Sequence, residues 1–497
     1  MIISHDLGTT GNKATLVDGT GTVVAAVTVA YDTDFGQGGK AEQDPQEWWR
    51  ALCAATRQLL EAHPGSRERI AGVSFSGQMM GAVLLDDAGE PVRPAIIWAD
   101  TRSTAQADQL VERVGMKRGY TITGHRLNAT YSLSKVMWVR DNEPEAFARS
   151  RHVMCAKDFV AYRLTGVMAT DPSDASGTNA YDQAARTWSG ELLDAAGVGD
   201  LFTEIVPSTQ VIGTVTAAAA SETGLVAGTP VVMGGGDGPM AALGVGVVDA
   251  ASGAYAYLGS SSWVSFAAEA PLHDPLMRTM TFNHVIPGTY VPTATMQAGG
   301  ASLQWIAEAL EPGDPAAYEG LLDAAASATA SADELYFLPH LLGERSPYWN
   351  PRARAAFIGL ARHHDRANLV RAVVEGVAFN LFTGLEAFTS TGARIASIDA
   401  IGGAANSSPL LQVFADVWGL PIRRRALVDE ATALGAAVVG GVAVGLFDDF
   451  SIAARLSEFT GDFVPDAARH REYLAAHARF LDAYRRIEPW FEGAGHE

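Results

Sequence analysis

The residues best suited to chemistry lie near the middle of this chain, where one carboxylate follows three glycines. The stretch 231–247, VVMGGGDGPMAALGVGV, runs from β-branched residues through the glycines to Asp237 and then into small residues. This order indicates a strand, a tight turn and the start of a helix. Glycines let a ligand approach the backbone, and the first helical N–H groups would point into the same space. Asp237 therefore either lies at a ligand-binding crevice or caps an ordinary strand-to-helix turn.

A second candidate lies at the N-terminus, where residues 2–18, IISHDLGTTGNKATLVD, predict two strands joined by a Gly/Thr turn. Asp6, at the end of the first strand, could hold a magnesium ion through water. The spacing is not that of a Walker A loop, and a plain hairpin is the alternative interpretation. As a ligand site, the turn would offer phosphate oxygens its N–H groups, hydroxyls and one cation from Thr9, Thr10, Gly11 and Lys13.

The same pattern recurs later in the chain. Residues 255–264, YAYLGSSSWV, repeat the order of strand, Leu-Gly, small or hydroxyl residues, and strand, with an offset of 251 residues from Leu7 to Leu258. Two similar halves would place two such hydroxyl-bearing turns opposite each other across a cleft. Tyr257 stands where the first copy has Asp6, so only the first half would hold the metal.

Further Gly-rich segments suit a nucleotide. Residues 297–305, QAGGASLQW, predict a Gly-rich entry into a helix, and the strand 398–401 runs into GGAANS and a helix at 408–418. A flat base could lie on such a backbone.

Other polar positions either allow a structural interpretation beside a functional one or fit no known metal site. Asp100 could bind a polar ligand or cap a helix over 101–113, and the cap is the preferred interpretation. The Asp-rich loop 170–182 does not fit the spacing of a calcium loop, so a capped, solvated loop is expected. The histidines at 340, 363 and 364 have no metal partners at usable spacing.

Composition limits the class of protein. A length of 497 residues predicts two domains of about 250 residues each. The net charge of −20, with one short basic run at 423–425, argues against a nucleic-acid or anionic-membrane partner. Cys53 and Cys155 are expected to be buried structural thiols. With no basic leader and a longest apolar run of 14 residues at 434–447, we expect a cytoplasmic protein without a membrane span.

Taken together, these motifs resemble the FGGY carbohydrate kinases, most closely the xylulokinases of that family. The resemblance covers nearly the full length and rests on eight ordered motifs: DLGTTGNK at 6–13, GQMMG at 77–81, WADTR at 98–102, KVMW at 135–138, GGGDG at 234–238, LGSSS at 258–262, GERSP at 343–347 and GGAANS at 402–407. Residues 355–375 also fit the C-terminal signature of the family.

The resemblance implies an α/β fold of two actin-like, ribonuclease-H-like domains, 1–248 and 249–497, with the active site in the cleft between them. It implies an ATP- and Mg²⁺-dependent sugar kinase in which Asp237 is the general base and Asp6 and Asp237 lie at the metal, and a homodimer is the oligomeric state we consider. The acceptor sugar would contact Gln78, Met79, Met80, Trp98, Asp100, Asp237 and Gly238. ATP would contact the first turn together with Gly259, Ser260, Gly299, Gly300, Gln304, Gly402, Gly403, Ala404, Asn406 and Ser407.

Two departures from the family pattern lie on the sugar side. Met80 stands where xylulokinases have histidine, and Gly238 stands where they have asparagine, so two hydrogen-bonding groups are lost. We therefore expect a kinase for a small sugar, a ketopentose such as D-xylulose, with another ketose, a polyol or an aldonate as alternatives. An actin- or chaperone-like ATPase is the rival of another class. An acyl hydrolase is discarded because no GxSxG spacing occurs around Ser74 and Ser76.

Overall fold

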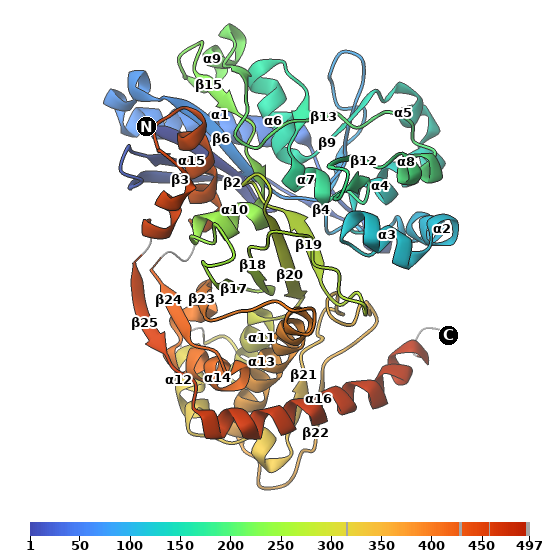
Figure 1. Ribbon diagram of the computed structural model, residues 1–497, viewed down its shortest axis with the longest axis vertical. Helices are drawn as coiled ribbons and strands as arrows, with labels where there is room; N and C mark the ends of the chain where they lie inside the picture. Colours follow the sequence, from blue (N-terminus) through green and yellow to red (C-terminus); the bar gives the residue numbers. More distant parts are fainter. Residues whose placement is uncertain (315–316, 427–429, 457, 494–497) are drawn as a thin grey trace.

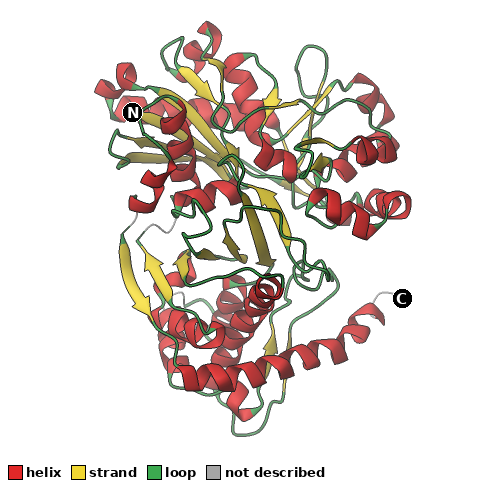
Figure 2. Ribbon diagram, in the orientation of Figure 1, coloured by secondary structure: helices red, strands yellow, loops and turns green. Residues whose placement is uncertain are grey.

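Two mixed β-sheets form the frame of the molecule (Figures 1 and 2), and the first comes from the N-terminal half. The computed structural model describes residues 1–314, 317–426, 430–456 and 458–493. In the first sheet β1 pairs antiparallel with β2 and parallel with β6, and a short strand, β16 (Gly235–Gly236), also pairs with β6. The strand order is β14 (Val211–Thr214), β15 (Pro230–Val232), β6 (Gly72–Gly77), β1 (Ile2–Leu7), β2 (Gly11–Val17) and β3 (Val23–Ala30).

The second sheet repeats the pairing of the first. Its strand β17 pairs antiparallel with β18 and parallel with β23, as β1 does with β2 and β6. The internal repeat predicted from the two Leu-Gly turns is therefore confirmed. The strand order is β19 (Met280–Asn283), β20 (Tyr290–Met296), β18 (Ser262–Phe266), β17 (Ala254–Leu258), β23 (Ile398–Ile401), β24 (Ile422–Arg425) and β25 (Phe459–Phe463).

The alternation of β1 decides where its polar residues point. Successive side chains of a strand face opposite sides of the sheet. Ile3 packs into the core formed with α1 (Pro45–Ala62), whereas Ile2 packs against α15 (Ala431–Ala443). Asp6 lies on the same face as Ile2, toward α15, at the carboxyl end of the strand.

Two helices lie between the sheets and join the halves. The helix α15 belongs by sequence to the second half, yet it packs on β1 and β6 of the first sheet and on α10 (Asp237–Gly244). Glycines permit the close contact, because a Cβ at Gly244 would lie 1.8 Å from Ala431 O and one at Gly435 would lie 2.1 Å from Met240 O. The boundary near residue 248 stays a prediction, and residues 494–497 of the second predicted domain lie outside the described part.

The remaining helices cover the outer faces. In the second half α13 packs against β18 and β20, and α16 crosses the far end and projects beyond the body (Figure 1). No helix in the described ranges combines the length and the apolar character needed to cross a membrane. The larger of these helices are α2 (Thr104–Val114), α4 (Ser132–Asn142), α6 (Ala156–Thr165), α11 (Gly300–Leu310), α13 (Arg366–Ser390), α14 (Ser408–Trp418) and α16 (Ala467–Gly493).

Candidate active site

Asp6 is held at the junction of the two halves. Its Oδ2 accepts a hydrogen bond of 2.5 Å from the hydroxyl of Thr432, at the start of α15. Burial raises the pKa of Asp6, while hydrogen bonds from Thr432 and Ser76 and the charge of Lys13 lower it. Lys13 is the residue opposite Asp6 in β2. The hairpin thus brings the carboxylate and the cation predicted for metal and phosphate to one place.

Asp237 is the first residue of α10 and follows β16 directly. The turn before it needs glycine, because Gly234 has a φ of 73° and a Cβ there would lie 2.1 Å from Phe75 O. Burial, and next the negative charge of Asp6, raise the pKa of Asp237 to about 7. The N–H of Gly238, which donates to Asp237 Oδ1 at 2.7 Å, and the charge of Arg345 act in the opposite direction. A carboxylate with this pKa can accept a proton near neutral pH.

A cavity of about 210 Å³ opens beside Asp237, between the two halves. That volume corresponds to about seven water molecules at the ~30 Å³ each occupies in the liquid, so the space suits a small polar acceptor. Among the predicted residues, those that line it are Thr9, Met79, Met80, Trp98, Asp237 and Gly238. Sequence reasoning missed the other lining residues: Ser261, Ser262, Trp263, Ser265, Met280, Phe282, Thr293, Thr295, Arg345 and Thr432.

Arg345 is the missed residue with the strongest chemical signal. It lies in GERSP, one of the eight motifs on which the resemblance rests, but the sequence analysis predicted no role for the arginine. Its Nε donates to Gln297 Oε1 at 3.1 Å, and its guanidinium lies 5.8 Å from the centre of the Trp98 ring. Burial lowers its pKa and the charges of Glu344 and Asp237 raise it, but neither carboxylate forms an ion pair with it among those found in the described residues. The cavity thus contains one cationic and one acidic side chain, Arg345 and Asp237.

Two predicted sugar contacts do not line this cavity. Gln78 is buried and donates through Nε2 to Gln43 Oε1 at 2.7 Å. Asp100 is also buried and accepts hydrogen bonds from the N–H groups of Ala41 and Arg102. The predicted Asp100 cap is wrong, because α2 begins at Thr104 and its N-cap residue is Ser103. The acid is instead engaged in an ion pair with Arg102 at 2.8 Å.

The turn after Asp6 is partly exposed to solvent. Gly8 N–H donates to Gly11 O and closes the turn, and Thr10 is exposed. The hydroxyl of Thr9 accepts a hydrogen bond of 3.0 Å from Trp98 Nε1, which links this turn to the sugar side of the cavity.

The equivalent turn of the second half lies at another cavity, of about 580 Å³. Gly300 N–H, at the start of α11, donates to Gly259 O at 2.7 Å, so the turn and the helix N-terminus are joined. Helix N-termini favour anions such as phosphate. Six predicted nucleotide residues line this cavity, namely Gly259, Ser260, Gly300, Gln304, Gly403 and Ala404.

The other four nucleotide residues predicted in the second half do not line it. Gly299 lies against Ser262, since a Cβ there would be 2.1 Å from Ser262 Oγ. Gly402 packs on the backbone of Leu258. Ser407 caps α14, accepting the N–H of Leu410, while the exposed Asn406 accepts a hydrogen bond from Arg424 through its carbonyl.

The Asp-rich loop 170–182 is buried, so the expected solvated loop is wrong. Asp171 caps the short helix α7 (Pro172–Ser176), as a capped loop requires, but both Asp171 and Asp174 are fully buried. They form ion pairs with the buried Lys157, whose charge offsets part of the cost of their burial. The thiol of Cys155 is buried as expected, whereas Cys53 is only partly buried.

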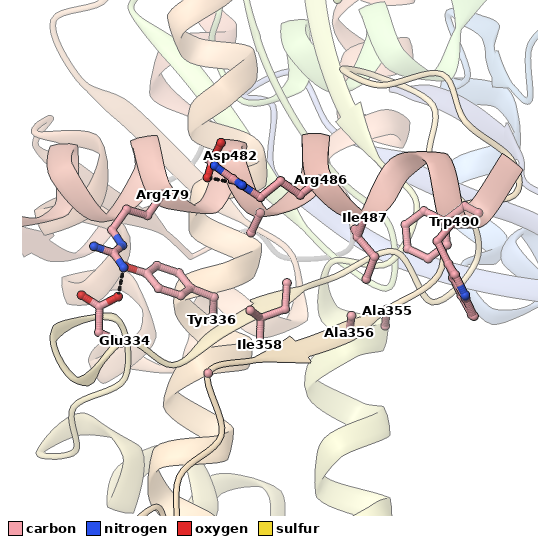
Figure 3. Close-up of a pocket in the computed structure, with 13 residues that line it drawn as sticks. Glu334, Tyr336, Ala355, Ala356, Ile358, Arg479, Asp482, Arg486, Ile487 and Trp490 are labelled. Carbon is pink, nitrogen blue, oxygen red and sulfur yellow. Dashed lines mark hydrogen bonds and ion pairs between the residues drawn. The ribbon is translucent and has the colours of Figure 1, made fainter.

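A larger hollow lies elsewhere, beneath α16 and beside β21 (Tyr336–Leu338) and β22 (Ala356–Ile358) (Figure 3). It measures about 1010 Å³, and none of the predicted site residues lines it. Its charged residues are paired with each other, Glu334 with Arg479 and Asp482 with Arg486. The candidate site residues therefore line the smaller cavities, between and beside the sheets, and not this one.

Comparison with known proteins decides the family. The model of the FGGY family of carbohydrate kinases, N-terminal domain, matches residues 1–244, and that of the C-terminal domain matches residues 254–444. This chain belongs to the FGGY family of carbohydrate kinases. It is therefore a sugar kinase, and ATP is a substrate of the kinases of this family. The actin- or chaperone-like ATPase considered from the sequence is set aside.

Relatives agree with this assignment over the whole chain. A xylulose kinase of Escherichia coli (strain K12) is 34% identical over 492 residues, with 98% of this chain and 99% of the relative covered. A gluconokinase of Bacillus subtilis (strain 168) is 28% identical, with coverage of 98% and 96%. The ligand-bound xylulose kinase structure from Lactobacillus acidophilus superposes with a TM-score of 0.94 at 26% identity and covers 99% of each chain. The predicted α/β fold of two actin-like domains is confirmed.

Proposed function

We propose that this FGGY kinase transfers the γ-phosphoryl group of ATP to a hydroxyl group of a ketopentose, with D-xylulose as the first candidate. One observation carries the proposal: Asp237, with a pKa of about 7, lines a small cavity between the halves and lies near Asp6. The names of the relatives support D-xylulose. The losses at Met80 and Gly238 leave room for other acceptors, since neither side chain supplies a strong hydrogen bond.

In the proposed reaction Asp237 accepts the proton of the attacking hydroxyl group. Positioning and charge stabilisation supply most of the catalysis of phosphoryl transfer, so the turns at Thr9 and Ser260 and the cation Lys13 would hold the phosphates. Asp6 and Asp237 fit a magnesium ion, because their carboxylate oxygens are hard ligands and the charge of Asp6 already raises the pKa of Asp237. When bound, the ion would neutralise phosphate charge.

An aldonate such as D-gluconate is the second candidate, and Arg345 is the observation that favours it. A guanidinium without a carboxylate partner, at the wall of a cavity, suits a bidentate contact with a substrate carboxylate. The Bacillus subtilis relative named gluconokinase agrees with this alternative.

A coupled assay of ADP release tests both candidates. ATP is supplied with ketopentoses, tetruloses, polyols or aldonates, and the values of kcat/KM are compared. We expect one acceptor to exceed the others and ATP turnover without acceptor to be slow. Turnover that does not depend on any acceptor would contradict the proposal.

The variant Arg345→Gln separates the two acceptors. It should reduce kcat/KM for D-gluconate by about tenfold or more, since a charge-assisted hydrogen bond is worth roughly 1.5–3 kcal/mol. Its effect on D-xylulose should be smaller. Equal losses for both acceptors would remove the argument for an aldonate.

The homodimer and the cytoplasmic location stay predictions. Sedimentation velocity of the wild-type protein tests the first, and cell fractionation tests the second.

A further inference from the structure

A buried charged cluster lies behind the active-site loops and takes no part in the cavity. Lys157, in α6, has no exposed surface and lies 2.5 Å from Asp158, 3.0 Å from Asp171 and 3.2 Å from Asp174. None of the four residues lines the cavity beside Asp237. Burying charges is costly unless they are paired, so a cluster of this kind calls for an explanation.

From this cluster a chain of hydrogen bonds leads to the residue before Asp237. Asp171 Oδ1 pairs with Lys157 Nζ, and Asp171 Oδ2 accepts the hydroxyl of Ser173 at 2.6 Å. Because the Ser173 hydroxyl donates its hydrogen to Asp171, its oxygen can only accept a further hydrogen bond. It accepts the N–H of Gly236 at 2.9 Å. The ion pair therefore fixes the direction of the Ser173 hydroxyl and, through it, the backbone next to Asp237.

The backbone around these hydrogen bonds is tightly packed, as the space for a Cβ at three glycines shows. A Cβ on Gly235 would lie 2.7 Å from Ser173 Oγ, and one on Gly77 would lie 3.1 Å from Lys157 Cβ. At the other end of α7, a Cβ on Gly177 would lie 3.1 Å from Met79 Cε. The cluster thus supports both the turn that carries Asp237 and the loop that carries the sugar-facing methionines.

The charge state of the cluster agrees with a permanent structural role. Burial alone would lower the pKa of Lys157, but the three carboxylates raise it well above its usual value, so the lysine stays protonated. Burial raises the pKa of Asp174 well above its usual value. Asp171 forms an ion pair with Lys157 and accepts hydrogen bonds from the hydroxyls of Ser173 and Ser208.

We propose that Ser173, oriented by Asp171 and Lys157, is a positioning residue that holds the N–H of Gly236 and thereby fixes the carboxylate of Asp237 in the reactive geometry. The inference rests on the proposed role of Asp237 as the general base. A displacement of about 1 Å at a reacting group can cost on the order of a hundredfold in rate.

The chain offers a matched control in Ser208. Its hydroxyl donates to the same oxygen of Asp171, at 2.7 Å, and it is buried like Ser173. Its side chain makes no hydrogen bond to Gly236 among those the described residues form. Ser173→Ala and Ser208→Ala therefore remove the same type of bond to Asp171, but only the first releases Gly236.

The experiment compares kcat, the KM values for ATP and acceptor, and Tm in the two variants and in Asp237→Asn. We expect Ser173→Ala to lower kcat by about tenfold to a hundredfold, with both KM values within about twofold, and Ser208→Ala to keep kcat within about threefold. Ser173→Cys retains a weak acceptor and should give an intermediate kcat, which keeps the test valid if Ser173→Ala is unstable.

Equal losses of kcat in Ser173→Ala and Ser208→Ala would overturn the proposal, since the effect would then come from Asp171 alone. So would a normal kcat in Ser173→Ala beside an inactive Asp237→Asn. A normal kcat in Asp237→Asn would instead refute the proposed general base, which separates the two failures.

Discussion

The pKa of Asp237 predicts the pH dependence of the reaction. A general base must be deprotonated, and burial and the charge of Asp6 raise this pKa to about 7. The deprotonated fraction is then about one tenth at pH 6 and about nine tenths at pH 8. We therefore expect kcat/KM, which reports the pKa of the free enzyme, to rise about tenfold between pH 6 and pH 8, with magnesium supplied as its ATP complex and at constant ionic strength. A flat profile from pH 5.5 to pH 8 would refute the reasoning.

Another buried group could imitate this profile, so the assay needs two variants. Burial lowers the pKa of Lys135 to about 7 as well. Its Nζ donates to the backbone carbonyl groups of Ala129 and Thr130, and Lys135 does not line the cavity. Lys135→Met should leave the inflection in place. Asp6→Asn removes a negative charge that raises the pKa of Asp237, so the inflection in its residual activity should move to lower pH. The opposite pattern would assign the titration to Lys135.

Three further predictions concern the metal, the cleft and the acceptor. Asp6→Ala should raise the magnesium concentration needed for half-maximal rate, and an unchanged magnesium titration would count against a metal role. Small-angle scattering should show compaction when sugar and a nonhydrolysable nucleotide bind together, because closure excludes water; an unchanged radius of gyration would contradict closure. Met80→His with Gly238→Asn should raise kcat/KM for D-xylulose by roughly 5- to 150-fold, since an unpaired hydroxyl costs about 1–3 kcal/mol. A Cβ at Gly238 meets no atom within 4 Å, so the space for the asparagine exists. A wild-type enzyme that already prefers D-xylulose strongly, with no gain in the double variant, would show that these two positions do not set specificity.

The pattern of the sequence was sufficient to predict the parts of the site that depend on local backbone. Asp6 precedes a glycine turn at the end of β1 and Asp237 follows a glycine turn at the start of α10, and such turns can be recognised from a few consecutive residues. The repeat of the Leu-Gly turn after 251 residues predicted the second sheet, and its strand pairing follows the first. These features are set by residues adjacent in the chain.

Features that depend on distant residues escaped prediction. Thr432 bonds to Asp6 across 426 positions, because α15 crosses back to the first sheet. The Asp-rich loop looked solvated because its neutralising cation, Lys157, lies on another element, α6. Asp100 looked like a helix cap, yet Arg102 and the N–H of Ala41 occupy its oxygens. In each case the partner of a charged group came from tertiary packing rather than from local spacing.

The turnover of Asp237→Asn tests the central claim most directly. The variant keeps the size of the side chain and removes the carboxylate that serves as the base and would also hold magnesium, so we expect kcat with the best acceptor to fall by roughly a hundredfold or more. Nucleotide affinity, measured by calorimetry, should stay within about threefold, because Asp237 does not line the cavity at Gly259 and Ser260. Near-normal kcat in a folded, nucleotide-binding Asp237→Asn protein would contradict the account.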